Sequence, residues 1–396
     1  MGEALRVRVR REKKFRRRRR GAILLVLLAV LVVVALVSWS WVDAQARAVV
    51  VISSVLDAPV LTPTVQTVSG EPRLSDETVA GNRALVARPA GDGPWPAVFF
   101  VNGTVPEGRK LPEARRLAEG FARAGYLVVL PDLPGLTEDR ITPETVAETA
   151  EVARAIPNHP DAANEGVALV GISTGATLAL LAAERPDVGK RVSLVAGVAP
   201  YSDIRTILNV ATTGRYEKEN GSFAHHDADP FLSYVVARSV VAALPSGDDR
   251  QTLSAEIEGV GRENPDPLGG LRLRRTEDLG PGAQDVVALL ANREPARFDG
   301  LYAALPQGVK EDLEVFSPLA GAGSINAPVE VATGPKDKYF PLSESYNLEG
   351  MAPDLRVTVT PAIDHAEVHS SLGDAPALAE FDAFVVRSLR GARLEE

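Results

Sequence analysis

Apolar and polar positions follow two different rhythms along the chain after about residue 64. Short, nearly continuous apolar runs are typical of strands that are buried on both faces. They occur at 82–89, 96–103, 126–132, 166–172, 192–200, 327–334 and 355–361. Segments with helical periodicity occur at 111–125, from about Thr142, and at 174–185, 343–353 and 377–393. Strands that alternate with helices predict an α/β fold with a mostly parallel central sheet and helices on both faces.

This rhythm breaks between residues 201 and 326. The segment contains helical patterns, such as 233–245, but no clear strand. A structureless loop of that length is implausible inside a compact domain. We therefore predict that 201–326 is a helical lid, called the cap below, inserted into a core formed by 64–200 and 327–396.

The N-terminal residues differ from the rest of the chain. Residues 1–20 contain eleven Lys and Arg against two Glu, a local charge of +9, whereas the whole chain carries −9. Residues 21–42 contain no charged residue. As a helix they would extend about 33 Å, enough to cross a hydrocarbon core of about 30 Å. Trp39 and Trp41 lie where an interfacial aromatic belt is expected.

This pattern predicts a basic cytoplasmic tail (1–20), a single transmembrane anchor (21–42) and a linker (43–63). Because basic flanks stay in the cytoplasm, the bulk of the chain would be extracytoplasmic. The alternative is a signal peptide cleaved near Ala44–Ala48, which would give a secreted protein, but the apolar run exceeds the roughly 7–15 residues of a signal-peptide core. Basic runs also bind nucleic acid, yet the adjoining apolar segment favours the membrane, and no nucleic-acid partner is predicted.

Composition removes several kinds of chemistry. The chain has no cysteine, so disulfides, thiolate nucleophiles and thiolate metal ligands are excluded. The stretch "AHHDADP" (224–230) gathers two histidines and two aspartates, but its spacing matches no metal-ligand pattern, and we interpret it as a polar loop of the cap. No glycine-rich phosphate loop follows the first strands. No metal or cofactor is predicted.

The stretch "GISTG", Gly171–Gly175, joins a predicted strand to a predicted helix. A nucleophilic serine needs this context, because its hydroxyl projects from the strand end while the glycines let the helix pack closely. Ser173 is therefore a candidate nucleophile, and the alternative is a small residue with no chemical role. The backbone N–H of Thr174, at the helix N-terminus, is free to point at a developing oxyanion.

A serine hydroxyl needs a base to take its proton, and the base needs an acid to orient it. His365 lies in the loop that leaves the last predicted strand, from which it can reach the carboxyl edge of the sheet. His369 is the second candidate for the base. It ranks below His365 because it lies further along the chain, near the start of the last predicted helix. Asp337, just after the strand 327–334, is favoured as the acid over Asp364, because adjacent residues on an extended segment point to opposite sides.

Residues 64–393 resemble the α/β-hydrolases. The resemblance rests on "GISTG" after a strand, on "GYLVVLPDLPG" (125–135), on "INAPVEVATGPKDKYFP" (325–341) with its aspartate before Pro341, and on a histidine after the last strand. In this family the chain order is nucleophile, acid, base, which implies Ser173, Asp337 and His365. The family also commonly inserts a lid after the sixth strand, where 201–326 lies.

The resemblance implies that the loop after the strand 96–103 completes the oxyanion hole with Thr174. The second donor would be the backbone N–H of Thr104 or of a neighbour. The chain departs from the family pattern at Asn102-Gly103, where many members have His-Gly, and at Ala176, where many have a second glycine. An asparagine can still orient that loop through hydrogen bonds.

We therefore expect a membrane-anchored serine hydrolase that cleaves an ester-type acyl bond, in a carboxylester, thioester or lipid-like substrate, through an acyl-enzyme. An acyltransferase on the same fold is an alternative, because an alcohol can replace water in the second step. A non-catalytic binding domain that keeps the fold is a third possibility. The presence of all three triad positions in order argues against it.

Overall fold

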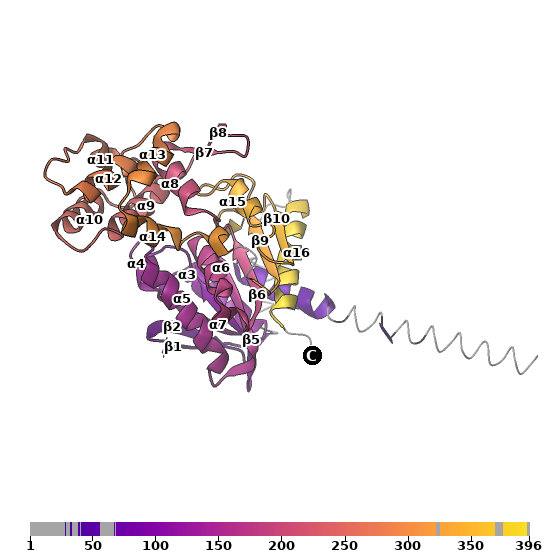
Figure 1. Ribbon diagram of the computed structural model, residues 1–396. Coiled ribbons are helices and arrows are strands. Elements are labelled where there is room, and N and C mark those ends of the chain that lie inside the picture. Colours follow the sequence, from indigo (N-terminus) through magenta and orange to yellow (C-terminus); the bar gives the residue numbers. More distant parts are fainter. Residues whose placement is uncertain are drawn as a thin grey trace, which may run out of the picture. The chain divides into compact units, whose positions relative to one another are not determined.

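The fold is described from a computed structural model of the 396-residue chain (Figure 1). The structure describes residues 28, 32–33, 39, 41–55, 67, 69–321, 325–368 and 375–393. The chain divides into two compact units, Met1–Arg47 and Ala48–Glu396. In the first unit, residues 41–47 are helical, and Arg47 Nε lies 2.8 Å from Asp43 Oδ2, one helical turn away.

The helices formed by the described residues include none that is both long and apolar enough to cross a bilayer. The predicted anchor, 21–42, lies largely outside the described residues and stays a prediction. The same holds for His369.

An eight-stranded sheet forms the centre of the second unit. In spatial order its strands are β1 (Arg73–Val79), β2 (Asn82–Arg88), β4 (Leu127–Pro131), β3 (Trp95–Val101), β5 (Ala162–Ile172), β6 (Val192–Val198), β9 (Val329–Thr333) and β10 (Leu355–Val359). The pairs β1–β2 and β2–β4 are antiparallel, and the other pairs are parallel. The predicted mostly parallel sheet is confirmed. The edge strand β1 was not predicted, because its sequence RLSDETV is polar and mostly exposed.

Helices cover both faces of this sheet. Those of the core are α3 (Pro112–Arg123), α4 (Pro134–Thr137), α5 (Pro143–Ala155), α6 (Thr174–Glu184), α7 (Pro186–Gly189), α15 (Leu342–Asn347) and α16 (Ala375–Gly391). Residues 48–55 are also helical. The start of α5 follows from its sequence, because the Thr142 hydroxyl accepts the Thr145 N–H and proline occupies the first turn.

Alternate side chains of β5 point to opposite faces, which separates the two helical layers. Leu169 belongs to a buried cluster with Val152 of α5 and Leu178 of α6. Val170 and Ile172 face the other side, where α3, α16 and the helical residues 48–55 lie. Ser173, the candidate nucleophile, therefore follows directly after a strand that is buried on both faces.

The cap emerges between β6 and β9 and is predominantly helical (Figure 1). Its elements are α8 (Ile204–Thr213), β7 (Arg215–Glu217), β8 (Phe223–His225), α9 (Pro230–Ala242), α10 (Asp248–Val260), α11 (Gly269–Leu273), α12 (Pro281–Leu290), α13 (Phe298–Ala304) and α14 (Gln307–Glu314). The short hairpin β7–β8 differs from the expectation of no strand in this segment. Both strands have three residues, too few for a period-2 pattern to be visible. A second buried cluster, formed mainly by cap residues, gives the segment its own core.

Candidate active site

Ser173 occupies a sharp turn between β5 and α6. Its backbone has φ 56° and ψ −130°, a strained conformation for a residue with a side chain. The Ser173 N–H donates to the Val198 carbonyl at 2.8 Å, which ties the turn to the neighbouring strand. A methyl group on Gly171 would overlap the Gly175 carbonyl, and one on Gly175 would overlap the Val101 carbonyl. Both glycines are therefore required for the backbone path that presents Ser173.

Asp337 and His365 lie in contact at the carboxyl edge of the sheet. His365 Nδ1 lies 2.7 Å from Asp337 Oδ2, and both side chains are almost completely buried. The Tyr339 and Phe340 N–H groups donate to Asp337 Oδ1 at 2.8 and 2.9 Å, so the carboxylate is fixed from two directions. With Nδ1 facing the carboxylate, Nε2 is the ring nitrogen left for another partner.

Two short loops bring this pair together. Asp337 lies in the loop after β9, and His365 follows the two-residue strand β11 (Ile363–Asp364), which pairs with β12 (Glu367–Val368). A methyl group on Gly334 would overlap the Ile363 carbonyl, so glycine allows the loops to approach. His365 has φ 53°, a left-handed backbone conformation that turns the chain between β11 and β12.

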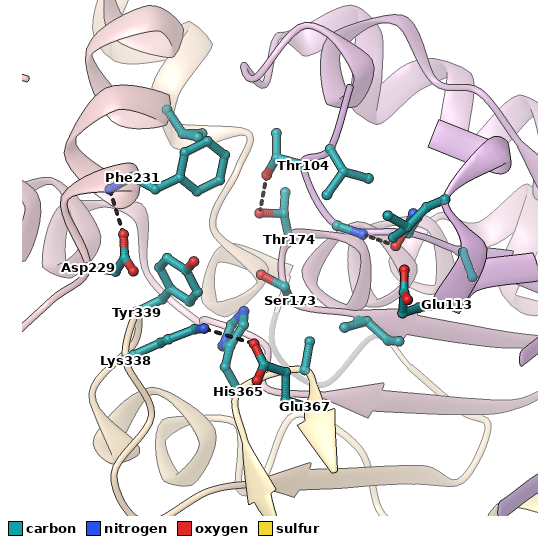
Figure 2. Close-up of a pocket in the computed structure, with 18 of the residues that line it drawn as sticks. Thr104, Glu113, Ser173, Thr174, Asp229, Phe231, Lys338, Tyr339, His365 and Glu367 are labelled. Atoms are coloured by element: carbon teal, nitrogen blue, oxygen red, sulfur yellow. Dashed lines mark hydrogen bonds and ion pairs between the residues drawn. The ribbon is translucent and has the colours of Figure 1, made fainter. Parts of the chain in front are cut away.

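Ser173 and His365 line the same cavity, of about 530 Å³. Figure 2 shows both side chains at this cavity, which we call the outer pocket. The structure thus brings together Ser173, His365 and Asp337 in the roles of hydroxyl, imidazole and carboxylate. A hydroxyl beside an imidazole that is oriented by a carboxylate can act as an activated nucleophile.

The two residues expected at an oxyanion hole are also adjacent. The hydroxyls of Thr104 and Thr174 lie 3.2 Å apart, and both residues are buried (Figure 2). A methyl group on Gly103 would lie 3.8 Å from Ser173 Oγ, so this loop passes directly beside the serine. Asn102 orders the loop, because its Oδ1 accepts the Gly103 N–H at 3.0 Å. The Thr174 N–H lies in the first turn of α6, where helices leave their N–H groups without an intrahelical acceptor.

Residues from the cap and from the Asp337 loop form the remaining walls. Phe231, at the start of α9, packs edge-on against Tyr339, with ring centroids 6.4 Å apart. Tyr339 in turn packs against the His365 ring at 4.4 Å. Burial and the neighbouring Asp229 carboxylate raise the pKa of Tyr339 above its ordinary value. These aromatic rings shield the imidazole from solvent on the cap side.

Sequence reasoning did not identify these wall residues. Tyr339 lies within the quoted "GPKDKYFP" and was available from its position beside Asp337, but Phe231 and Val55 are distant in the chain. Arg262 also lines the pocket, stacking over Phe231 with its guanidinium carbon 4.7 Å from the ring centroid. No local signal marks such residues, because only tertiary packing brings them to the site.

The segment "APYSDI" (199–204) forms a structural corner. Tyr201 is buried and packs edge-on against Phe340, and Glu344 Oε2 accepts the N–H groups of Ser202 and Asp203, each at 2.9 Å. Burial raises the pKa of the Glu344 carboxyl to about 7. This corner fixes the entry into the cap and adds no group to the outer pocket.

The two histidines of "AHHDADP", His225 and His226, do not line the outer pocket. His225 is exposed in β8, and its Nδ1 lies 2.9 Å from the Gly214 carbonyl. Asp229 has a different role, since it caps α9 by accepting the Phe231 N–H at 2.9 Å. Within the described part of the chain, no cluster of three or more His, Asp or Glu could hold a metal ion.

Comparison with known proteins adds a family match. A sequence model described as X-Pro dipeptidyl-peptidase (S15 family) matches residues 83–265, less than half of the chain. This match supports a hydrolase of amide or ester bonds. No curated protein is significantly similar to the chain in sequence.

Solved structures of several hydrolases are similar to this chain. One is 2,6-dihydroxy-pseudo-oxynicotine hydrolase, with 15% identity and a TM-score of 0.42 over 80% of this chain and 68% of that chain. Another is acylaminoacyl peptidase from Pyrococcus horikoshii, with 14% identity and a TM-score of 0.43 over 82% of this chain and 42% of that chain. A third is proline iminopeptidase from Mycobacterium smegmatis, with 16% identity and a TM-score of 0.43 over 81% and 98%. The chain spans less than half the length of the acylaminoacyl peptidase.

The strand order, the turn at Ser173 and the cap between β6 and β9 together give the chain an α/β-hydrolase-like fold.

Proposed function

We propose that this chain is a serine hydrolase in which Ser173 is the nucleophile, His365 the general base and acid, and Asp337 the residue that orients His365. One observation carries the proposal. Ser173 is held in a strained turn at the same pocket as His365, and the Nδ1 of His365 faces a buried carboxylate at 2.7 Å. Strained backbone of this kind is concentrated at functional sites, which favours a chemical role for Ser173.

In the proposed reaction, Ser173 Oγ attacks the acyl carbonyl while its proton passes to His365 Nε2. The backbone N–H groups of Thr174 and Thr104 stabilise the oxyanion. The bond to the leaving group then breaks, and His365 returns the proton to the departing oxygen, sulfur or nitrogen. Water, deprotonated by His365, cleaves the acyl-enzyme in the same way and releases the acid.

The test is labelling of the detergent-solubilised full-length chain with a fluorophosphonate probe. We expect labelling of the native protein and none after heat denaturation or in the Ser173→Ala variant. Labelling that persists in Ser173→Ala would show that another group reacts. A folded protein that is not labelled and hydrolyses no ester or amide would favour the binding-domain alternative.

For the substrate, we propose a carboxylester, a thioester or a lipid-like acyl compound. The support is the apolar character of the walls around Ser173, where Phe100, Leu117 and Val235 contribute to the outer pocket. Hydrolysis is distinguished from acyl transfer by product analysis in the presence of a short alcohol, since a transferase forms the new ester at the expense of the free acid.

A peptidase is the second candidate, because the matching family model describes an X-Pro dipeptidyl-peptidase. The two candidates differ in the leaving group, which is an alcohol or thiol in one and an amine in the other. Parallel assays with p-nitrophenyl esters and with Xaa-Pro p-nitroanilides separate them. A higher kcat/KM for the anilides would replace the ester proposal and leave the roles of Ser173, His365 and Asp337 intact.

We also propose that residues 21–42 anchor the protein in the cell membrane, with the N-terminus cytoplasmic and the hydrolase outside. The support is the uncharged run, its Trp39 and Trp41, and the basic residues 1–20. The expected result is recovery of the full-length chain in the membrane fraction after a high-salt wash, with the hydrolase digested by protease added to intact cells. A soluble product that starts near residue 47 would instead show signal cleavage.

A further inference from the structure

The outer pocket adjoins a second cavity on the α3 and α16 side of the sheet. This second cavity, called the inner cavity here, has a volume of about 100 Å³. Four residues line both cavities: Val55, Leu117, Ile172 and Ala366. Two of them adjoin the proposed machinery in sequence, because Ile172 precedes Ser173 and Ala366 follows His365. The inner cavity therefore lies next to the two residues that flank the proposed machinery.

The described residues that line the inner cavity are apolar except for Ser388. Val170 belongs to β5, and Ala196 and Val198 belong to β6. Phe121 of α3 and Phe384 of α16 lie among the other wall residues. The one hydroxyl on these described walls, that of Ser388, donates to the Phe384 carbonyl at 2.9 Å. A polar group entering this space would lose hydrogen bonds to water without replacement, whereas a hydrocarbon chain would lose none.

The helical residues 48–55 form an ordered wall of the same space. A methyl group on Gly120 of α3 would lie only 2.8 Å from Ser54 Cβ, so the missing side chain lets this helix pack closely on α3. Val51, Ile52 and Val55 from the same turn line the inner cavity. The wall therefore has a defined position against α3.

The charged residues among the described walls line the outer pocket and not the inner cavity. They are Glu113, Asp229, Arg262, Glu263, Lys338 and Glu367. Asp229, Arg262 and Lys338 belong to the cap and to the loop after β9, and Figure 2 shows Asp229 and Lys338 on the side of Phe231 and Tyr339. Leu117 and Ile172, in contrast, line both cavities. The described walls of the inner cavity therefore carry no charge, whereas those of the outer pocket do.

We propose that the inner cavity binds the acyl chain of the substrate, so that the enzyme prefers esters of medium-length aliphatic acids. This rests on the proposed function. Attack by Ser173 would leave the hydrocarbon chain in the inner cavity as part of the acyl-enzyme. The alcohol, carrying the proton from His365, would leave through the outer pocket, and water would then release the free carboxylic acid.

The experiment measures kcat/KM of the detergent-solubilised full-length chain for p-nitrophenyl acetate, butyrate, hexanoate and octanoate. Burial of each methylene is expected to raise kcat/KM by about fourfold until the inner cavity is full. A profile that is flat or falls from acetate to octanoate overturns the proposal. If instead no ester is hydrolysed and the fluorophosphonate does not label Ser173, the proposed function itself fails, which is a different result.

Two variants test the location of the chain. Ala196→Ile fills the inner cavity from β6, and Leu117→Trp adds bulk from α3 at the boundary that the two cavities share. Each should lower the ratio of octanoate to acetate kcat/KM at least tenfold. Ala283→Ile makes the same change at a buried position of α12 in the cap and should keep the wild-type ratio. Thermal unfolding identifies a variant that fails to fold, and an unchanged ratio in a folded Leu117→Trp protein would overturn the assignment.

Discussion

Asp337 holds His365 through a 2.7 Å contact between Oδ2 and Nδ1, while its other oxygen accepts the backbone N–H groups of Tyr339 and Phe340. The carboxylate is therefore bonded before any substrate arrives. This arrangement selects one tautomer of His365, with the proton on Nδ1 and a free electron pair on Nε2. The orientation of the base is built into the loop after β9.

Replacing Asp337 by Asn should damage turnover more than folding. The amide can accept the same two backbone N–H groups with its oxygen, but its NH₂ group would then face Nδ1 and stabilise the wrong tautomer. We expect kcat to fall by about 10³–10⁴, as is typical for loss of the triad carboxylate.

The measurement is steady-state kinetics on an activated ester, with circular dichroism to verify folding. Ser173→Ala and His365→Ala should lower kcat to a similar extent as each other. The double variant should lose no more kcat than either single variant, because the effects of residues that act as a unit are not additive. Additive losses would show that the two residues act independently.

The glycine that follows Ser173 by two positions has a measurable structural role. A methyl group on Gly175 would overlap the carbonyl oxygens of Val101 and Asn102, which belong to a rigid strand end. We expect Gly175→Ala to lower the free energy of unfolding by about 1–3 kcal/mol. Chemical denaturation monitored by fluorescence measures this loss.

The neighbouring Ala176→Gly variant is the matched control. Ala176 stands where many α/β-hydrolases have glycine, and Gly197 lies opposite, where an added methyl would approach the Ala176 methyl to 3.2 Å. The missing side chain of Gly197 therefore accommodates Ala176. Ala176→Gly should lower the free energy of unfolding by only about 1 kcal/mol, the ordinary cost of glycine in a helix. Equal losses in both variants would contradict the close-approach argument.

The predictable parts of the fold are those with a strong local signal. Strands β3, β4, β5 and β6 are buried on both faces and therefore read as continuous apolar runs. Ser173 could be identified because its turn requires two glycines at fixed spacing. Asp337 and His365 could be placed at the same edge because the carboxyl ends of parallel strands converge there.

The remaining parts depend on contacts between distant segments. The edge strand β1 is polar and exposed, so its pairing with β2 has no hydrophobic signature. The pocket walls Phe231 and Val55 come from the cap and from the helical residues 48–55. The left-handed backbone of His365 is equally invisible in the sequence, because it follows from the packing of two loops.

The start of α9 is coupled to the loop that carries the acid. The Asp229 N–H donates to the Lys338 carbonyl at 2.7 Å, and the Asp229 side chain accepts the Phe231 N–H. Asp229→Ala removes the side-chain cap and should lower the free energy of unfolding by about 1 kcal/mol. It should also raise KM, because Phe231 forms a pocket wall, whereas Asp229→Asn keeps the cap and should retain most of the affinity.

Asp203→Ala is the control for this prediction. Asp203 caps α8 in the same way, by accepting the Arg205 N–H at 3.0 Å, but it does not line the outer pocket. Because its carboxylate also accepts the Ser317 and Thr206 hydroxyls, the variant should cost at least as much stability as Asp229→Ala, with no change in KM. A KM that is unchanged in Asp229→Ala would show that the capped end of α9 does not shape the substrate site.

The buried Glu344 predicts a pH dependence of stability. Burial raises the pKa of its carboxyl from 4.5 to about 7, so folding favours the protonated form. Its contribution is therefore fully present below pH 4.5 and is lost as the pH rises through about 7, a change of roughly 3 kcal/mol. Glu184, whose pKa burial raises to about 8, contributes with the same sign over a higher range.

Glu344→Gln should remove the Glu344 part of this slope. Glutamine can still accept the Ser202 and Asp203 N–H groups through its oxygen, and it carries no charge to bury. Urea denaturation at pH 5 and pH 8 should show a smaller difference in unfolding free energy for the variant than for the wild type. Glu349→Gln, an exposed substitution of the same kind just after α15, should leave the difference unchanged. If Glu344→Gln retains the full wild-type slope, the pH dependence arises from other groups and the corner at Ser202 tolerates an ionised Glu344.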